Sequence, residues 1–343
     1  MEMEYVKKIV KASGIRPGER VLVHFWGEDG QKGLANAFMS AVAARGATPI
    51  FLQQARSVNR EIFANAGEGC FPESYFESLS GFDTVLDLFA YQPIILGYPL
   101  EEKQMALYRR YISKLFGALM TARRFLQIRL PIAENAEESG LAPEDYIARM
   151  EAAYGIDYDA LQSVGGTRIR ELNRYNHYVL HTGEGSSLWF DLTGRQWHLD
   201  AGDGDWPCGE VYIAPREEKT VGSVFFPKLF IEDVGVFENV VLYIREGRLA
   251  DSSHPQVREF IEGLAPEGRV VCELGLGLNP GVKDLCGYTV LDEKMAGTFH
   301  IAIGANNIFG GENKANMHID FVNSGAFVLA PEKETENESE ENE

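Results

Sequence analysis

Three segments in the second half of the chain hold carboxylate or histidine side chains in settings where they could do chemistry. Glu210 stands between a Gly turn and an alternating strand, within PCGEVYIAP. Glu273 ends an apolar strand and precedes three closely spaced glycines, within VVCELGLGLNPGV, where the backbone can approach a ligand or ion. Glu293 and His300 stand at the two ends of a turn into a strand, within LDEKMAGTFHIAIGAN.

A fourth segment, MHIDFV, holds the most specific signal, a histidine and an aspartate two residues apart. Side chains two apart lie on one face of a strand, so His318 and Asp320 project together. Two ionisable groups on one face of an apolar strand are costly to bury unless they pair or coordinate an ion. Taken alone, a Glu after a Gly is usually solvated, and a histidine such as His300 is more often a hydrogen-bonded core residue than a ligand.

Together, four carboxylates and two imidazoles make a metal site the simplest explanation. Hard divalent ions take carboxylates, and imidazole suits zinc, iron, cobalt and manganese. Six ligands are too many for one tetrahedral zinc ion, but they fit two ions that share a bridging carboxylate, as in two-metal hydrolases. The residues expected to bind metal are Glu210, Glu273, Glu293, His300, His318 and Asp320.

The elements that must position these residues change in character along the chain. The first half alternates short apolar strands with helices, which favours an α/β domain of three layers with a mainly parallel sheet over residues 1–165. Strands are expected over residues 20–26, 48–52 and 84–89, and helices over residues 33–45, 101–116 and 142–153.

From about Thr167 the sequence becomes rich in strands, with turn residues between them. We expect a second, strand-rich α/β domain over residues 166–330 that carries the metal site. Its first strands are expected over residues 178–182, 187–192, 221–226 and 240–244. The last segment, 331–343, reads PEKETENESEENE and is predicted to be a disordered acidic tail because it cannot bury apolar surface.

Composition excludes several classes of function. The net charge of -19 argues against nucleic acid or an anionic membrane as a partner, because the phosphate field repels it. No window approaches the roughly 20 apolar residues of a membrane span, and the charged N-terminus lacks the apolar region of a signal peptide. The scattered cysteines show neither zinc-knuckle nor redox spacing. We therefore expect a cytoplasmic protein.

Four segments, GEVYIAP, ELGLGLNPG, DEKMAGTFHIAIG and MHIDFV, resemble in order the motifs of the metallo-aminopeptidase family that includes aminopeptidase T and aminopeptidase S. The resemblance covers the second domain strongly and the first only in its α/β character. It implies two divalent ions of zinc, cobalt or manganese, a small peptide as substrate, and a homodimer. Carried over, the family's metal-binding residues fall on Glu210, Glu273, Glu293, His300, His318 and Asp320.

This chain departs from the better known members of that family in two places. They carry a tyrosine, thought to act in catalysis, seven residues after the first metal-binding histidine, where this chain has Asn307. The gap between Glu293 and His300 is also longer here. We expect Glu273 to act as bridge or base, and Asn307 or its neighbour Asn306 to donate an amide hydrogen bond to the oxyanion.

Two other functions stay open at this point. The dihydroxypyridine ring-cleaving dioxygenases resemble relatives of the same family, and His300, His318 and Asp320 have the composition of a two-histidine, one-carboxylate iron(II) site. A mononuclear iron site has no need of three further glutamates, which favours hydrolysis. The other alternative is a metal-binding biosynthetic protein without peptidase activity, and the missing tyrosine supports it.

Overall fold

The computed structural model describes residues 3–97 and 100–332, and the chain divides into two compact units. The first unit contains residues 1–163, 200–209 and 279–296, and the second contains residues 164–199, 210–278 and 297–343. Helix α8 (Tyr158–Leu172) contains the first point where the chain passes between the units, after residue 163, and also the predicted boundary at residue 165. Of the predicted acidic tail, residues 333–343 lie outside the described residues, and Pro331 ends strand β15.

The first unit is built on a four-stranded parallel sheet in the order β2-β1-β3-β4. The central strands are apolar runs buried along almost their whole length, as expected for a sheet covered on both faces. Its strands are β1 (Arg20–Trp26), β2 (Thr48–Gln53), β3 (Thr84–Phe89) and β4 (Arg124–Arg129). The first three correspond to the predicted strands, and β4 is an addition.

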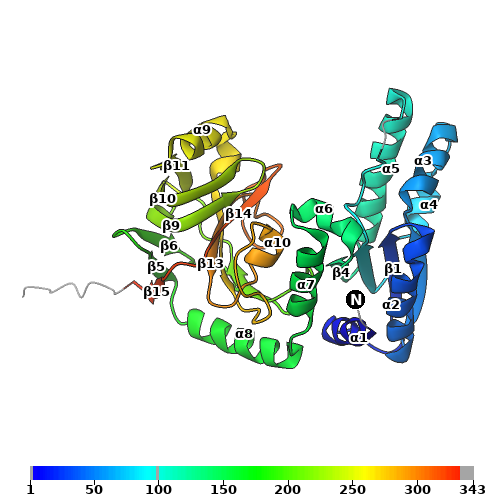
Figure 1. Ribbon diagram of the computed structural model, residues 1–343, viewed down its shortest axis with the longest axis horizontal. Helices are drawn as coiled ribbons and strands as arrows, with labels where there is room; N and C mark the ends of the chain where they lie inside the picture. The colour runs from blue at the N-terminus through cyan, green and yellow to red at the C-terminus, as the bar shows by residue number, and fades with distance from the viewer. Residues whose placement is uncertain (1–2, 98–99, 333–343) are drawn as a thin grey trace, which may run out of the picture. The chain divides into compact units, whose positions relative to one another are not determined.

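Helices cover the two faces of this sheet. Helix α2 connects β1 to β2, whereas α3, α4 and α5 follow β2 and β3, and right-handed crossovers place these two groups on opposite faces. Helices α3, α4 and α5 lie side by side (Figure 1), and Phe63, Phe76 and Tyr111 from them share one core with Leu22 and Val85 of the sheet. The helices of the unit are α1 (Met3–Ala12), α2 (Lys32–Ala44), α3 (Arg56–Asn65), α4 (Glu73–Ser78), α5 (Glu102–Leu119), α6 (Ala136–Ser139), α7 (Pro143–Tyr154) and α10 (Thr289–Asp292).

The second unit contains two sheets of mainly antiparallel strands. One has six strands in the order β11-β10-β9-β6-β5-β15, and the other has five in the order β14-β13-β12-β8-β7. The strands are β5 (His177–His181), β6 (Ser187–Asp191), β7 (His198–Asp200), β8 (Glu210–Ile213), β9 (Val221–Ile231), β10 (Gly235–Arg245), β11 (Arg248–Ser252), β12 (Val271–Gly277), β13 (Phe299–Gly304), β14 (His318–Asn323) and β15 (Val328–Pro331). Helix α9 (Pro255–Gly263) packs beside β11 (Figure 1).

One hydrophobic core joins the two sheets of this unit. Phe226 of the six-stranded sheet contacts Phe299 of the five-stranded sheet, with ring centroids 6.1 Å apart. Val211, Leu274 and Ile301 of the five-stranded sheet belong to the same buried cluster. One face of the five-stranded sheet is therefore committed to the core, and the next residue along each strand points to the opposite face. The predicted fold class, a parallel α/β domain followed by a strand-rich α/β domain, is confirmed.

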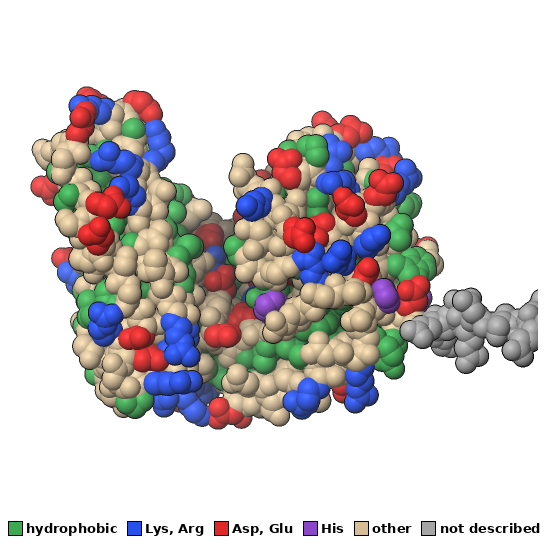
Figure 2. Space-filling model, turned by 180° about the vertical axis from the view of Figure 1, so that it is seen from behind, with side chains coloured by type: hydrophobic (Ala, Val, Ile, Leu, Met, Phe, Trp, Pro, Cys, Tyr) green, Lys and Arg blue, Asp and Glu red, His purple; other side chains and the backbone are tan. Residues whose placement is uncertain are grey.

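Acidic and basic side chains are interspersed over the face of the molecule shown in Figure 2. Within the described residues, every helix is too short or too polar to cross a membrane.

Candidate metal centre

Five of the six predicted ligands lie on the face of the five-stranded sheet that points away from the core. In β8, β13 and β14, the alternation of side chains along the strand places them there. In β13, Phe299 and Ile301 enter the core, so His300 between them faces the other way. In β14, Phe321 enters the core, and His318 and Asp320 share the opposite face. Glu210 occupies the same face at the start of β8.

A β-bulge turns Glu273 toward this face. The pairing of β12 with β13 shifts between Val271, which lies opposite Ile303, and Glu273, which lies opposite Ala302. The extra residue is Cys272. In a regular strand without the bulge, Val271 and Glu273 would point to the same side, because side chains two apart share a face. With it, Val271 stays in the core and the carboxylate of Glu273 faces the other ligands. Bulges are common beside active sites for this reason.

Small residues in the middle of the face make room for the ligands. Gly275 lies opposite His300, and a Cβ added at Gly275 would lie 1.9 Å from Nε2 of His300. The imidazole therefore occupies the space that a side chain at residue 275 would need. Ala302 lies between Glu273 and Asp320 in the register and leaves the gap between the two carboxylates open.

The first group of potential ligands consists of Glu210, Glu273 and His300, and all three are buried. Nε2 of His300 lies 3.2 Å from Oε1 of Glu273 and 3.3 Å from Oε2 of Glu210. Each residue offers a ligand atom, and these atoms lie within 4.8 Å of one another. We call this group triad A.

The second group, triad B, consists of Glu273, His318 and Asp320. Nε2 of His318 lies 3.6 Å from Oε2 of Glu273 and 3.4 Å from Oδ1 of Asp320. The other ring nitrogen, Nδ1, lies 3.0 Å from the carbonyl oxygen of Ala305. Nδ1–H donating to this carbonyl leaves Nε2 to act as a ligand, which is how metal-binding histidines are usually oriented. Glu273 belongs to both triads, with one oxygen toward each histidine.

The charges of the carboxylates act strongly on both histidines. Burial alone lowers the pKa of His300, but the hydrogen bond to Glu273 and the charges of Glu210 and Asp320 outweigh it and raise the pKa to about 9. The pKa of His318 is also raised, because the hydrogen bond to Asp320 outweighs burial. Each triad thus favours a positive charge between its carboxylates.

The donor atoms fit divalent cations. Carboxylate oxygens and imidazole nitrogens are ligands that zinc, manganese, cobalt and iron accept. Oδ1 of Asp320 is buried and, apart from Nε2 of His318 at 3.4 Å, has no polar partner among the described residues, so a cation there would satisfy it. His318 is the exposed member of the five and leaves one side of the site accessible from solvent.

Glu293 belongs to neither triad and falls in the first unit, whereas the other five predicted ligands fall in the second. It follows helix α10 as the C-cap residue, and its carboxylate lies 2.8 Å from Nζ of Lys294. The structure therefore brings five of the six predicted ligands together, and the role of Glu293 as a ligand stays a prediction. Its local setting is the end of a helix beside a lysine.

The two asparagines proposed as oxyanion donors differ in their surroundings. Asn306 is fully buried, and its Nδ2 donates to Glu217 Oε1 at 3.0 Å and to the carbonyl oxygen of Cys272 at 3.4 Å. Because its amide group already donates to these two acceptors, Asn306 holds the loop in place and is not positioned as an oxyanion donor. Asn307 is exposed, at the start of the loop between β13 and β14. Its catalytic role stays a prediction.

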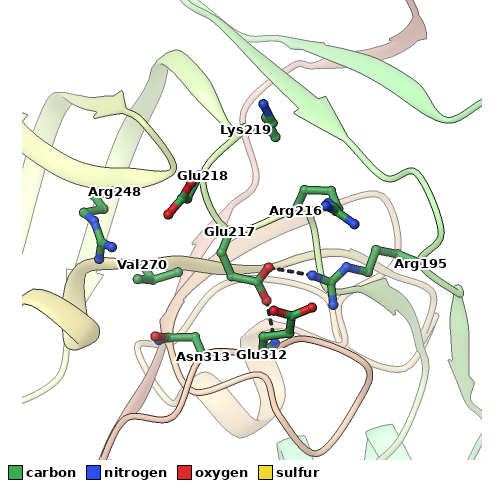
Figure 3. Close-up of a pocket in the computed structure, with 9 residues that line it drawn as sticks. All are labelled: Arg195, Arg216, Glu217, Glu218, Lys219, Arg248, Val270, Glu312 and Asn313. Carbon is green, nitrogen blue, oxygen red and sulfur yellow. Dashed lines mark hydrogen bonds and ion pairs between the residues drawn. The ribbon is translucent and has the colours of Figure 1, made fainter.

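Side chains from other elements anchor this loop, residues 305–317. Glu217 accepts hydrogen bonds from Asn306 and from the N–H of Glu312, and it pairs with Arg195 at 2.5 Å. Arg195 also donates to the carbonyl oxygen of Gly310. Figure 3 shows Glu217 directed toward Arg195 and the backbone of Glu312. These residues line a cavity of about 390 Å³. Burial acts to raise the pKa of Glu217, but these hydrogen bonds and the Arg195 charge lower it.

Replacing Gly275 by alanine is expected to weaken metal binding about 10- to 100-fold, because the new Cβ displaces the ring of His300. The core lies on the opposite face of the sheet, so the far-UV circular dichroism should stay close to that of the wild type. The matched control is Gly263→Ala, where an added Cβ meets no atom within 4 Å. Titration with zinc measures both affinities, and equal values for the two variants would contradict the placement of His300.

No protein-family model matches the sequence, and a search of curated proteins finds no match. Two solved structures share the fold. Wild-type AmpT from Thermus thermophilus is 16% identical, with a TM-score of 0.65 over 95% of this chain and 97% of that chain. The 2,5-dihydroxypyridine dioxygenase from Pseudomonas putida KT2440 is 16% identical, with a TM-score of 0.61 over 94% of this chain and 91% of that chain. The likeness establishes the fold and leaves the reaction open, because one fold can host different chemistries.

Proposed function

We propose that this protein is a metal-dependent aminopeptidase, which uses two divalent cations of zinc, cobalt or manganese to hydrolyse the N-terminal peptide bond of small peptides. The observation that carries the proposal is the position of Glu273, whose two carboxylate oxygens belong to two different triads. A shared carboxylate is the arrangement of two-metal hydrolases, whose ions lie roughly 3.5–4 Å apart. The homodimer and the cytoplasmic location stay predictions.

In this proposal, triad A would hold one cation and triad B the other, with Glu273 between them. When bound, the two cations would lower the pKa of a water molecule and polarise the scissile carbonyl. A carboxylate oxygen of the triads would take the proton of that water, and Asn307 would donate its amide N–H to the oxyanion. His318 would keep its orientation through the Ala305 carbonyl.

The donor chemistry of the loaded site supports a substrate with a free amino terminus. Three carboxylates and two imidazoles form the five-residue cluster, and two divalent cations would offset the negative charge of the carboxylates. A free α-amine would then bind in its neutral form, as a nitrogen ligand of the kind that zinc, cobalt and manganese accept. The shared fold with AmpT, an aminopeptidase T, supports the same substrate class. The exposed side of His318 is where we propose that the peptide enters.

The fold is shared equally with a dihydroxypyridine dioxygenase, and the arrangement of the ligands is the observation that favours one function over the other. A non-haem iron(II) oxygenase uses two histidines and one carboxylate around a single ion. Here each triad has one histidine and two carboxylates, and His300 and His318 fall in different triads. This division favours hydrolysis over ring cleavage.

The test is a comparison of two activities on the same purified protein. Loaded with zinc, cobalt or manganese, it should hydrolyse aminoacyl amides and dipeptides, and blocking the amino group of the substrate should abolish the reaction. Loaded with iron(II) under oxygen, it should not cleave a dihydroxylated pyridine. Ring cleavage without peptide hydrolysis would replace this proposal by the dioxygenase, and neither activity, with metal bound, would support the biosynthetic alternative.

A further inference from the structure

An aromatic cluster borders both triads on the same side of the five-stranded sheet. Tyr212 follows Glu210 by two residues in β8 and therefore shares its face. The ring of Tyr212 stacks on His198, with centroids 5.2 Å apart, and Phe309 meets Tyr212 edge-on at 5.5 Å. Phe309 also lies 6.0 Å from the ring of His318. We call His198, Tyr212 and Phe309 the aromatic wall.

The aromatic wall is not part of the core. Its three residues are each half-buried and belong to no buried cluster among the described residues. At one end of the wall, Tyr212 lies two residues after Glu210 of triad A. At the other end, Phe309 lies beside His318 of triad B. The charged ligands of the site are thus bordered by apolar ring surface that solvent can still reach.

Phe309 is held in place through its backbone. Nε2 of His198 lies 3.1 Å from the carbonyl oxygen of Phe309, and Arg195 donates to the carbonyl oxygen of Gly310 next to it. The N–H of Phe309 donates to the carbonyl oxygen of Asn306. The side chain of Asn306 in turn donates to Glu217. Because the backbone that carries the ring is held in this way, the loop loses less conformational entropy when a ligand binds against the ring.

Resting on the function proposed above, we propose that the aromatic wall is the subsite for the first side chain of the peptide and selects apolar side chains. A free α-amine bound as a nitrogen ligand at the triads would place the side chain on the same Cα beside the site. Ring surface is the part of the border that gains from contact with apolar atoms, since burying apolar area releases water. Phe309, which touches both Tyr212 and His318, is the residue on which selection depends.

Binding of amino acid hydroxamates tests this without relying on turnover. Calorimetry with the zinc-loaded protein should give an affinity for leucine hydroxamate at least about tenfold above that for glycine hydroxamate. Phe309→Ala should lower this ratio to near one, whereas Phe309→Leu, which keeps apolar surface, should retain most of it. Tyr243→Ala removes an exposed aromatic ring from the six-stranded sheet and serves as the control, with the ratio of the wild type.

The outcomes separate the subsite from the reaction. A ratio that depends on Phe309 in a protein without peptidase activity would support the subsite and overturn the aminopeptidase. An equal loss of affinity for both hydroxamates in Phe309→Ala would show that Phe309 only supports His318, and would overturn the subsite. Tighter binding of lysine or aspartate hydroxamate than of leucine hydroxamate would also overturn it, whatever the activity.

Discussion

Replacing Glu273 by glutamine is expected to lower kcat for an aminoacyl amide by about 100- to 10 000-fold. Glutamine is nearly isosteric with glutamate, but its amide nitrogen cannot accept a proton or act as an anionic ligand. Glu273 directs Oε1 toward His300 and Oε2 toward His318, so this one change affects both triads. Steady-state kinetics with a metal-loaded protein measures the loss, and metal analysis shows whether binding or chemistry is affected.

The matched control for this variant is Glu259→Gln, an exposed glutamate in α9. It removes the same charge from the same unit and should leave kcat within about twofold, because changes at exposed positions without contacts have small effects. Glu273 is buried in β12, so thermal unfolding must also be compared. Wild-type activity in a folded Glu273→Gln protein would show that the shared carboxylate is neither bridge nor base.

The parallel sheet of the first unit could be predicted where strands are continuous apolar runs. Residues 20–26 and 84–89 read RVLVHFW and TVLDLF, and both are central strands. Strand β4 (RFLQIR) was harder to recognise, because it is an edge strand whose Arg124 and Arg129 are only half-buried. Edge strands carry charged residues to avoid aggregation, and this hides them from hydrophobic patterns.

The predicted start of the second domain, residue 166, falls inside helix α8. Gly165 and Gly166 indicate a break, since glycine destabilises a helix interior, yet α8 continues through both. The structure gives the reason for one of them. A Cβ at Gly165 would lie 2.2 Å from Cδ1 of Leu199, so the glycine lets that leucine pack against the helix. Tertiary packing here outweighs local propensity.

The candidate site was predictable where the signal is local. His318 and Asp320 lie two apart in a strand, and the period of the strand alone places them on one face. The orientation of Glu273 depends on the bulge at Cys272, which no spacing in the sequence reveals. The exclusion of Glu293 from both triads depends on how the chain between α10 and β13 folds, which is again not a local property.

The aromatic wall was the part of the site that sequence reasoning missed. Tyr212 appears in an alternating strand, where its position two residues after Glu210 could have indicated the shared face. His198 and Phe309 gave no comparable signal, because they come from a short strand and a loop, and only the fold brings them to Tyr212. Neither residue lies in a segment with a periodic hydrophobic pattern.

On the proposed two-metal function, replacing His318 by alanine is expected to reduce the bound metal from two ions per chain to one. His318 supplies the only nitrogen of triad B, and without it Glu273 and Asp320 alone remain there. Triad A keeps all three of its residues, including His300, so its ion should stay. Metal analysis after dialysis measures the ratio. We expect hydrolysis to fall by at least about 100-fold, because both ions of a two-metal site act on the same water and carbonyl.

The matched control is His181→Ala, an exposed histidine of β5 in the six-stranded sheet, which should keep two ions and full activity. The thermal stability of each variant with and without metal gives a second measure, since a ligand that binds only the folded protein raises the unfolding temperature. The metal-dependent rise should be smaller for His318→Ala than for His181→Ala. If His318→Ala instead kept two ions and the full rise, His318 would be a polar neighbour of the site, and triad B would not be a metal site.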